Sequence, residues 1–66
     1  MTGAELKAIR QALGFTLSGF GKALGYQGNK NTLSVNIRRF ESGARLIPDR
    51  IADRVMELVQ GKSIGG

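Results

Sequence analysis

Apolar residues recur at helical spacing in four separate stretches of the chain, and each stretch is followed by a glycine. The apolar positions of the first stretch are Leu6, Ile9 and Leu13. Thr2 and Glu5 precede them as a capping-box pattern, and Gly14 suits the left-handed stop after a last helical turn. We therefore predict a helix over about residues 3–13.

The second stretch predicts a short helix, with Thr16 as its N-cap and Gly25 as its end. Its apolar positions are Leu17, Phe20 and Leu24. Gly21 lies inside this helix, where glycine costs up to about 1 kcal/mol relative to alanine. We interpret this cost as a sign that another helix approaches closely there; a flexible helix is the alternative.

Residues 26–32 are polar and rich in turn formers, so they predict a loop. A third helix follows, capped by Asn31 or Thr32 and ended by Gly43. The inward positions of this helix are Leu33, Ile37 and Phe40. The positions on its other side are Ser34, Val35, Arg38, Arg39 and Ser42.

A fourth helix is predicted to begin at Pro48, with Asp49 in its first turn, and to end at Gly61. Its apolar stripe consists of Ile51, Val55, Leu58 and Val59. Residues 62–66 are expected to form a frayed, flexible tail. The pattern as a whole predicts an all-α, compact fold of four to five helices, organised as one domain over residues 1–66.

The composition excludes several classes of site. The chain has no cysteine and no histidine, so disulfides and the usual transition-metal sites are ruled out, and its five acidic residues suggest no paired catalytic site. We expect no enzyme activity, no cofactor, no metal and no small-molecule ligand. No apolar run approaches the roughly 18 residues that span a bilayer, and no signal-peptide pattern occurs, so we expect a cytoplasmic protein without membrane contact.

Positive charge is concentrated in the middle of the chain. Lys and Arg number 10 against 5 Asp and Glu, a net charge of +5. Five of the basic residues lie in the segment from position 22 to position 45, in which Glu41 is the one acidic residue. The charges of residues 46–66 cancel. One continuous basic segment is what a polyanion-binding surface requires. A generally basic surface is the alternative.

The second and third predicted helices have the features of a pair that reads DNA. Such a pair needs a small residue where the helices cross, a glycine at the turn and a polar, basic outer face on the second helix. Gly21, Gly25 and the face formed by residues 34–39 meet these needs in order. A helix of this kind fits the major groove, where Arg pairs with guanine and Asn with adenine.

Three segments resemble the Cro/lambda-repressor-like (XRE) helix-turn-helix family. They read "LKAIRQALG" from Leu6, "FTLSGFGKALG" from Phe15 and "NIRRFESGARLIP" from Asn36. The most specific part is "IRRFESG", residues 37–43, which is similar to the I-x-R-W-E-x-G ending of the family's recognition helix. The resemblance extends to about Leu58 and implies a lambda-repressor-like DNA-binding domain with the helix-turn-helix at its second and third helices.

The resemblance also implies a structural ion pair between Arg10 and Glu41, whose loss would leave one partly buried charge unpaired. The chain departs from the family pattern in two places. Leu17 stands where the family usually has a glutamine that contacts a phosphate, so that contact is in doubt. The turn before the third helix is longer by about six residues, roughly 27–32, which surface loops tolerate at little cost. Its small, polar residues favour contact with DNA over a passive role.

The predicted DNA contacts come from the second helix, the long turn, the third helix and the segment after it. They are Thr16, Ser18, Lys22, Asn29, Lys30, Asn31, Thr32, Ser34, Val35, Asn36, Arg38, Arg39 and Arg45. Of Arg38 and Arg39, we expect one to read a base and the other to bind a phosphate. Val35 either packs on a thymine methyl group or is partly buried, and Asn36 lies close to the inward face.

A single module of this kind reads few base pairs, so we expect a homodimer on a palindromic operator, with half-sites about 34 Å apart as in known dimers of the family. Surplus apolar residues on the fourth helix are the candidate dimer contacts, and completion of the core is the alternative. They are Ala52, Met56, Val59 and Ile64.

These features predict a sequence-specific, double-stranded-DNA-binding transcriptional regulator that represses its own promoter. The resemblance implies repressors of phages or mobile elements, which include regulators of anti-CRISPR operons and antitoxin-type autorepressors. One alternative is a protein-binding module, such as a phage-type inhibitor, that uses the same basic face. Another is RNA binding, for which Tyr26 is the only plausible exposed stacking ring.

Overall fold

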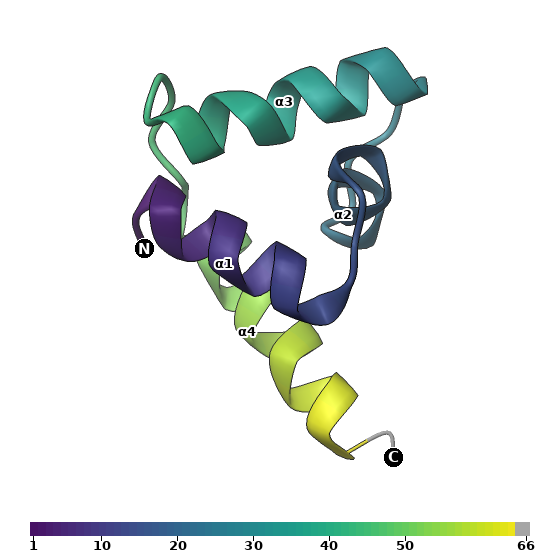
Figure 1. Ribbon diagram of the computed structural model, residues 1–66, viewed down its shortest axis with the longest axis vertical. Helices are drawn as coiled ribbons and strands as arrows, with labels where there is room; N and C mark the ends of the chain where they lie inside the picture. Colours follow the sequence, from purple (N-terminus) through teal and green to yellow (C-terminus); the bar gives the residue numbers. More distant parts are fainter. Residues whose placement is uncertain (65–66) are drawn as a thin grey trace.

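The computed structural model describes the backbone of residues 1–64 and the side chains of residues 1–61. Its elements are the helices α1 (Gly3–Leu13), α2 (Leu17–Ala23), α3 (Lys30–Ser42) and α4 (Asp49–Ile64), and residues 1–64 contain no strand. The predicted all-α class is therefore confirmed. Helix α3 lies across one end of the molecule, and α4 runs toward the opposite end (Figure 1).

Helix α1 has the predicted bounds because both of its ends are formed by local interactions. The Glu5 backbone N–H donates to the Thr2 hydroxyl at 3.1 Å, and the Thr2 backbone N–H donates to the Glu5 carboxylate at 3.1 Å. Gly14 follows with a φ of 81°, the left-handed conformation that glycine adopts without strain. The hydrogen bond from the Thr2 backbone lowers the pKa of Glu5 below 4.5, so the cap contributes stability above that pH and loses it as the pH falls through the lowered pKa.

Helix α3 begins earlier than predicted, so the prediction of a loop over residues 26–32 was wrong at its end. The N-cap is Asn29, whose side-chain oxygen accepts from the Thr32 backbone N–H at 2.9 Å. Asn31 and Thr32 therefore lie in the first helical turn, and neither is the cap. Gly28, with a φ of 138°, turns the chain into the helix in a conformation that other residues rarely adopt. Asparagine is at least as good an N-cap as threonine. The turn at Gly28 leads directly into Asn29, so the helix begins there.

The predicted end of the fourth helix was also wrong, because α4 continues through Gly61 to Ile64. Among the described residues, no atom outside its own helix lies within 4 Å of the position that a Cβ on Gly61 would take, so the glycine neither ends the helix nor makes a close contact with them. Residues 62–64 are helical rather than frayed. The remainder of the predicted tail, residues 65–66, lies outside the described residues, as does the side chain of Ile64.

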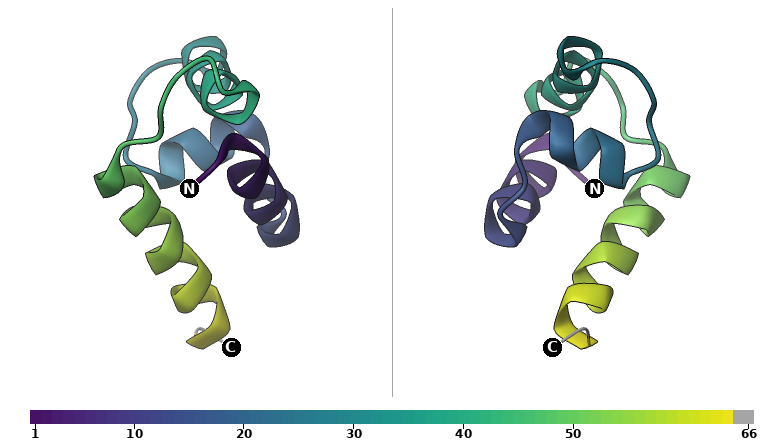
Figure 2. Two further views of the ribbon diagram at one scale, coloured as in Figure 1. Left: turned by 90° about the vertical axis from the view of Figure 1, so that its left-hand side faces the viewer. Right: turned by 90° about the vertical axis from the view of Figure 1, so that its right-hand side faces the viewer.

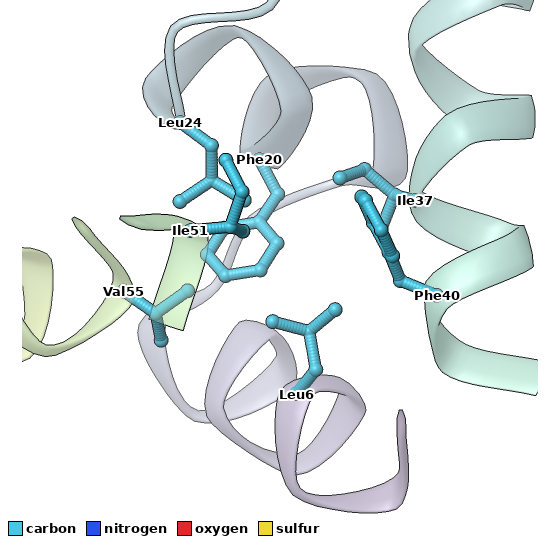
Figure 3. Packing of buried hydrophobic residues seen from close by; sticks show 7 residues of the cluster. All are labelled: Leu6, Phe20, Leu24, Ile37, Phe40, Ile51 and Val55. Carbon is cyan, nitrogen blue, oxygen red and sulfur yellow. The ribbon is translucent and has the colours of Figure 1, made fainter. Parts of the chain in front are cut away.

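All four helices contribute to a single hydrophobic core, with the Phe20 ring at its centre (Figure 3). The buried side chains of this cluster are Leu6, Phe20, Leu24, Ile37, Phe40, Ile51 and Val55. Phe15 packs on its edge, with its ring centroid 5.4 Å from that of Phe20. Hydrophobic periodicity does not identify Phe15 as a packed residue, because it lies between α1 and α2, outside any periodic stripe.

The crossing of α2 over α3 confirms the interpretation of Gly21. A Cβ on this buried glycine would lie 3.3 Å from the Leu33 Cβ and 3.4 Å from the Ile37 Cγ1, which is tighter than most real contacts. Helices α2 and α3 form the most extensive helix–helix contact in the described chain. The absence of a side chain at position 21 therefore sets how closely α3 is held to the rest of the fold.

A second close approach generates a test of the packing. A Cβ on Gly3 would overlap the backbone carbonyl oxygens of Phe40 and Glu41, so the start of α1 is pressed against the end of α3. We expect Gly3→Ala to lower the free energy of unfolding by about 1–3 kcal/mol, the usual cost of overpacking. Urea unfolding followed by circular dichroism measures it.

The matched control is Gly61→Ala, also a helical glycine, with open space around its Cβ position. Here alanine should raise stability by up to about 1 kcal/mol through helix propensity alone. Equal effects of the two substitutions would contradict the close contact at Gly3.

Candidate nucleic-acid interface

An ion pair joins the first helix to the end of α3. The Arg10 Nε donates to the Glu41 Oε2 at 2.7 Å, and the exposed fractions of the two side chains are only 13% and 9%. A second guanidinium nitrogen of Arg10 donates to the Phe15 backbone carbonyl at 3.0 Å. One arginine therefore ties together α1, the turn that leads into α2 and the last turn of α3.

This pair also determines the charge that α3 presents to solvent. Glu41 is the one acidic residue between positions 22 and 45, and its carboxylate is turned inward onto Arg10. The basic residues of the same segment are exposed. They are Lys22, Lys30, Arg38, Arg39 and Arg45. The segment therefore presents positive charge with no carboxylate of its own beside it to oppose that charge.

The outward face of α3 contains an open hollow of about 230 Å³. Val35, Arg38, Arg39 and Ser42 line it, at positions i, i+3, i+4 and i+7 of one helix, and most of its lining is apolar. Val35 is 42% exposed and belongs to no part of the core. The partly buried alternative for Val35 therefore does not describe this structure, although the contact with a thymine methyl stays a prediction.

A second hollow lies where α2 meets the start of α3, and it brings together predicted residues that are distant in sequence. Thr16, Ser18 and Lys22 of the α2 region line it opposite Lys30 of α3, around a volume of about 340 Å³. The Thr16 hydroxyl oxygen accepts from the Gly19 N–H at 3.0 Å, which leaves the hydroxyl hydrogen available for donation. Two ammonium groups and two hydroxyls around one hollow suit a phosphate oxygen.

The remaining predicted contacts are less uniform. Asn29, Asn31 and Thr32 are exposed at the start of α3, whereas Ser34 and Asn36 are half-buried. Arg45 lies after α3, outside both hollows. Its backbone N–H donates to the Arg39 carbonyl at 3.2 Å, and its guanidinium carbon lies 5.8 Å from the centroid of the Phe40 ring, within cation–π range.

Tyr26 and Leu17 are both partly buried against the core. The ring centroid of Tyr26 lies 6.2 Å from that of Phe40, and Tyr26 packs against the core, so it is not the exposed stacking ring that the RNA alternative needs. Leu17, at the position where the resembling family has a glutamine, also packs against the core. Its apolar side chain replaces a phosphate contact with packing.

The candidate dimer residues lie on α4, which runs away from α3 and extends with its C-terminal end beyond the other helices (Figure 2). Met56 is 45% exposed, and Ala52 and Val59 are half-buried. In the part of the chain that the structure describes, Ala52 and Met56 do not belong to the core cluster. Leu46, which is 90% exposed in the α3–α4 connection, is an apolar surface residue that the sequence analysis did not single out.

The described residues contain no group of three or more carboxylate, cysteine or histidine side chains that could hold a metal ion. Among them, no helix is both long enough and apolar enough to cross a bilayer.

Comparison with known proteins identifies one related family. A family model described as Aca2/YdiL-like matches residues 1–64. No curated protein and no solved structure matches the chain.

The ion pair predicts a specific pattern of stabilities. Removing one partner leaves the other charge partly buried and unpaired. We therefore expect Glu41→Leu and Arg10→Met each to lower the free energy of unfolding by about 3 kcal/mol. The double variant should recover at least half of this loss, because no unpaired charge remains. Urea unfolding of the four proteins, analysed as a double-mutant cycle, measures the coupling. If the two losses of unfolding free energy simply add in the double variant, the coupling between Arg10 and Glu41 is contradicted.

Proposed function

This chain belongs to the Aca2/YdiL-like family of anti-CRISPR-associated helix-turn-helix regulators, and we propose that it binds double-stranded DNA sequence-specifically and regulates transcription. In this proposal α2 and α3 form the helix-turn-helix, and α3 enters the major groove. The observation that carries it is the outward face of α3, where Arg38 and Arg39 are exposed and the segment's own carboxylate is held inward by Arg10.

The charge arrangement supports DNA as the partner for a physical reason. A duplex carries one negative charge per about 1.7 Å of its axis, so an interface with opposed carboxylates would be repelled. With Glu41 removed from the surface, the face of α3 meets that field with cations alone. Arginine is also the side chain best suited to the paired acceptors of guanine in the major groove.

The second hollow supports a division of labour within the site. Lys22 and Lys30, with Thr16 and Ser18, are suited to phosphate oxygens and would set the position of α3 in the groove without reading sequence. Asn29, Asn31 and Thr32, at the exposed start of α3, are proposed to contact the nearby backbone or base edges, and so are Ser34 and Asn36. Arg45 is proposed as a further phosphate contact beyond the other end of the helix.

We further propose that the protein acts as a homodimer on a palindromic operator, through the apolar face of α4 formed by Ala52, Met56 and Val59. The direction of α4, which runs away from α3 toward the opposite end of the molecule, supports the assignment (Figure 2). In a two-fold dimer on DNA both recognition helices must face the same duplex, so contacts at the opposite end leave both of them uncovered.

Repression is the simplest mode of action for such a protein. A dimer bound over a promoter excludes polymerase without any further activity, and an operator upstream of the protein's own gene would make it an autorepressor. We propose this role.

The two arginines of α3 allow a direct test of sequence-specific DNA binding. Purified protein is titrated against DNA from its own upstream region and against scrambled DNA at two salt concentrations, with the variants Arg38→Ala and Arg39→Ala. Loss of a base-reading arginine should cost about 1–3 kcal/mol of binding and relax sequence preference. Loss of a phosphate-binding arginine should weaken both complexes equally and reduce the salt slope by about 1.

Lys7→Ala is the matched control, because it removes an exposed positive charge from α1, outside the proposed surface. It should leave the preference for the upstream DNA unchanged. Equal binding of both DNAs by the unmodified protein, with no effect of either arginine substitution, would contradict the proposal and point to an acidic protein partner.

The second prediction concerns the dimer. Met56→Glu places a charge on an exposed apolar position, so we expect a shift toward monomer in sedimentation equilibrium with an unchanged helical spectrum. Gln11→Glu adds the same charge at an exposed position of another helix, α1, and should leave the association unchanged. Identical association of both variants and the unmodified protein would rule out this face as the interface.

A further inference from the structure

Val35 is an apolar residue that the fold does not need. It is 42% exposed in the middle of α3, and it is not a member of the core cluster. A β-branched side chain at an exposed helical position is a poor choice for helix stability, because its rotamers are restricted there and no packing offsets that cost. Its contribution should therefore lie in what the helix contacts.

The surroundings of Val35 define the chemistry of that contact. The hollow beside it is mostly apolar, and Arg38 and Arg39 form part of its wall. Glu41, the nearest acidic residue along the helix, is paired with Arg10 and does not face this side. The occupant that complements such a hollow is a small apolar group carried on an anionic scaffold.

DNA offers one such group in the major groove, the 5-methyl of a pyrimidine. The spacing is also suitable. Val35 and Arg38 are three residues apart, which corresponds to about 4.5 Å along the helix axis. Successive bases along a strand are about 3.4 Å apart, so two side chains with this separation can address neighbouring base pairs.

We propose that the hollow formed by Val35, Arg38, Arg39 and Ser42 receives the 5-methyl group of a pyrimidine, while one of the two arginines binds a guanine in the neighbouring base pair. Val35 is then a specificity-determining residue, and thymine and 5-methylcytosine share the chemistry that it reads. The inference rests on the proposed binding of DNA through α3 and adds the base chemistry that this helix selects.

The test removes the methyl group without changing base pairing. Footprinting first locates the bound site, and each thymine within it is then replaced in turn by deoxyuridine. Burial of one methyl group corresponds to about 0.8 kcal/mol, so binding by the unmodified protein should weaken about fourfold at one thymine per half-site. At that position 5-methylcytosine should likewise bind about fourfold more tightly than cytosine, which separates the methyl group from the rest of the base.

Val35→Ala is the decisive variant, and alanine is also the better helix former, so the fold should be retained. It should bind the thymine operator about fourfold more weakly and should no longer distinguish thymine from deoxyuridine. Leu46→Ala removes another exposed apolar side chain outside the hollow, and the variant should keep the full discrimination.

The failures of the inference and of the proposed function are distinguishable. Specific operator binding that tolerates every deoxyuridine, or a Val35→Ala protein that still discriminates, overturns the inference and leaves the proposed function in place. A change in self-association in Val35→Ala, with discrimination retained, assigns the hollow to a second copy of the chain and also overturns it. Absence of any preference for the operator in the unmodified protein overturns both the inference and the proposed function.

Discussion

The contact of Arg10 with Glu41 is the interaction on which both the architecture and the surface of this protein depend. Its guanidinium reaches the carboxylate at 2.7 Å and the Phe15 carbonyl at 3.0 Å, so it fixes the relative positions of α1, the start of α2 and the end of α3. Such a pair is costly to desolvate and contributes little net stability compared with apolar packing. Its value here lies in geometry and in charge, because it holds α3 in place and removes the acidic group from the surface of the basic segment.

Close helix packing sets the rest of the arrangement. A chain this short buries little surface, so each buried side chain must serve several helices, as Phe20 does at the centre of the core (Figure 3). Two glycines make this possible. Gly21 lets α2 lie against Leu33 and Ile37, and Gly3 lets the start of α1 reach the last carbonyl groups of α3. Helix α3 is thereby held from two sides while its outward face stays open.

The molecule separates its two surfaces in space. Helix α3, with its exposed basic residues, lies at one end of the molecule, and α4, with the exposed Met56, runs toward the other (Figures 1 and 2). This separation is consistent with a regulator of the Aca2/YdiL-like family, because contacts with DNA and contacts between subunits would not compete for the same face. The mostly apolar hollow beside Val35 lies within the basic end, between the side chains of Arg38 and Arg39.

The sequence by itself determined the features that depend on local interactions. The capping box, the glycine stop and the apolar spacing predicted α1 at its observed bounds, and the periodicity of α3 identified Leu33, Ile37 and Phe40 as buried. It failed where local signals compete, because Asn29 and Asn31 are both good caps and because Gly61 suits a helix end as well as a helix interior. Only the tertiary structure placed Lys30 beside Lys22 and packed Tyr26 against Phe40. These features depend on how closely α2 and α3 cross, a distance set by packing between residues far apart in the chain, which hydrophobic periodicity does not encode.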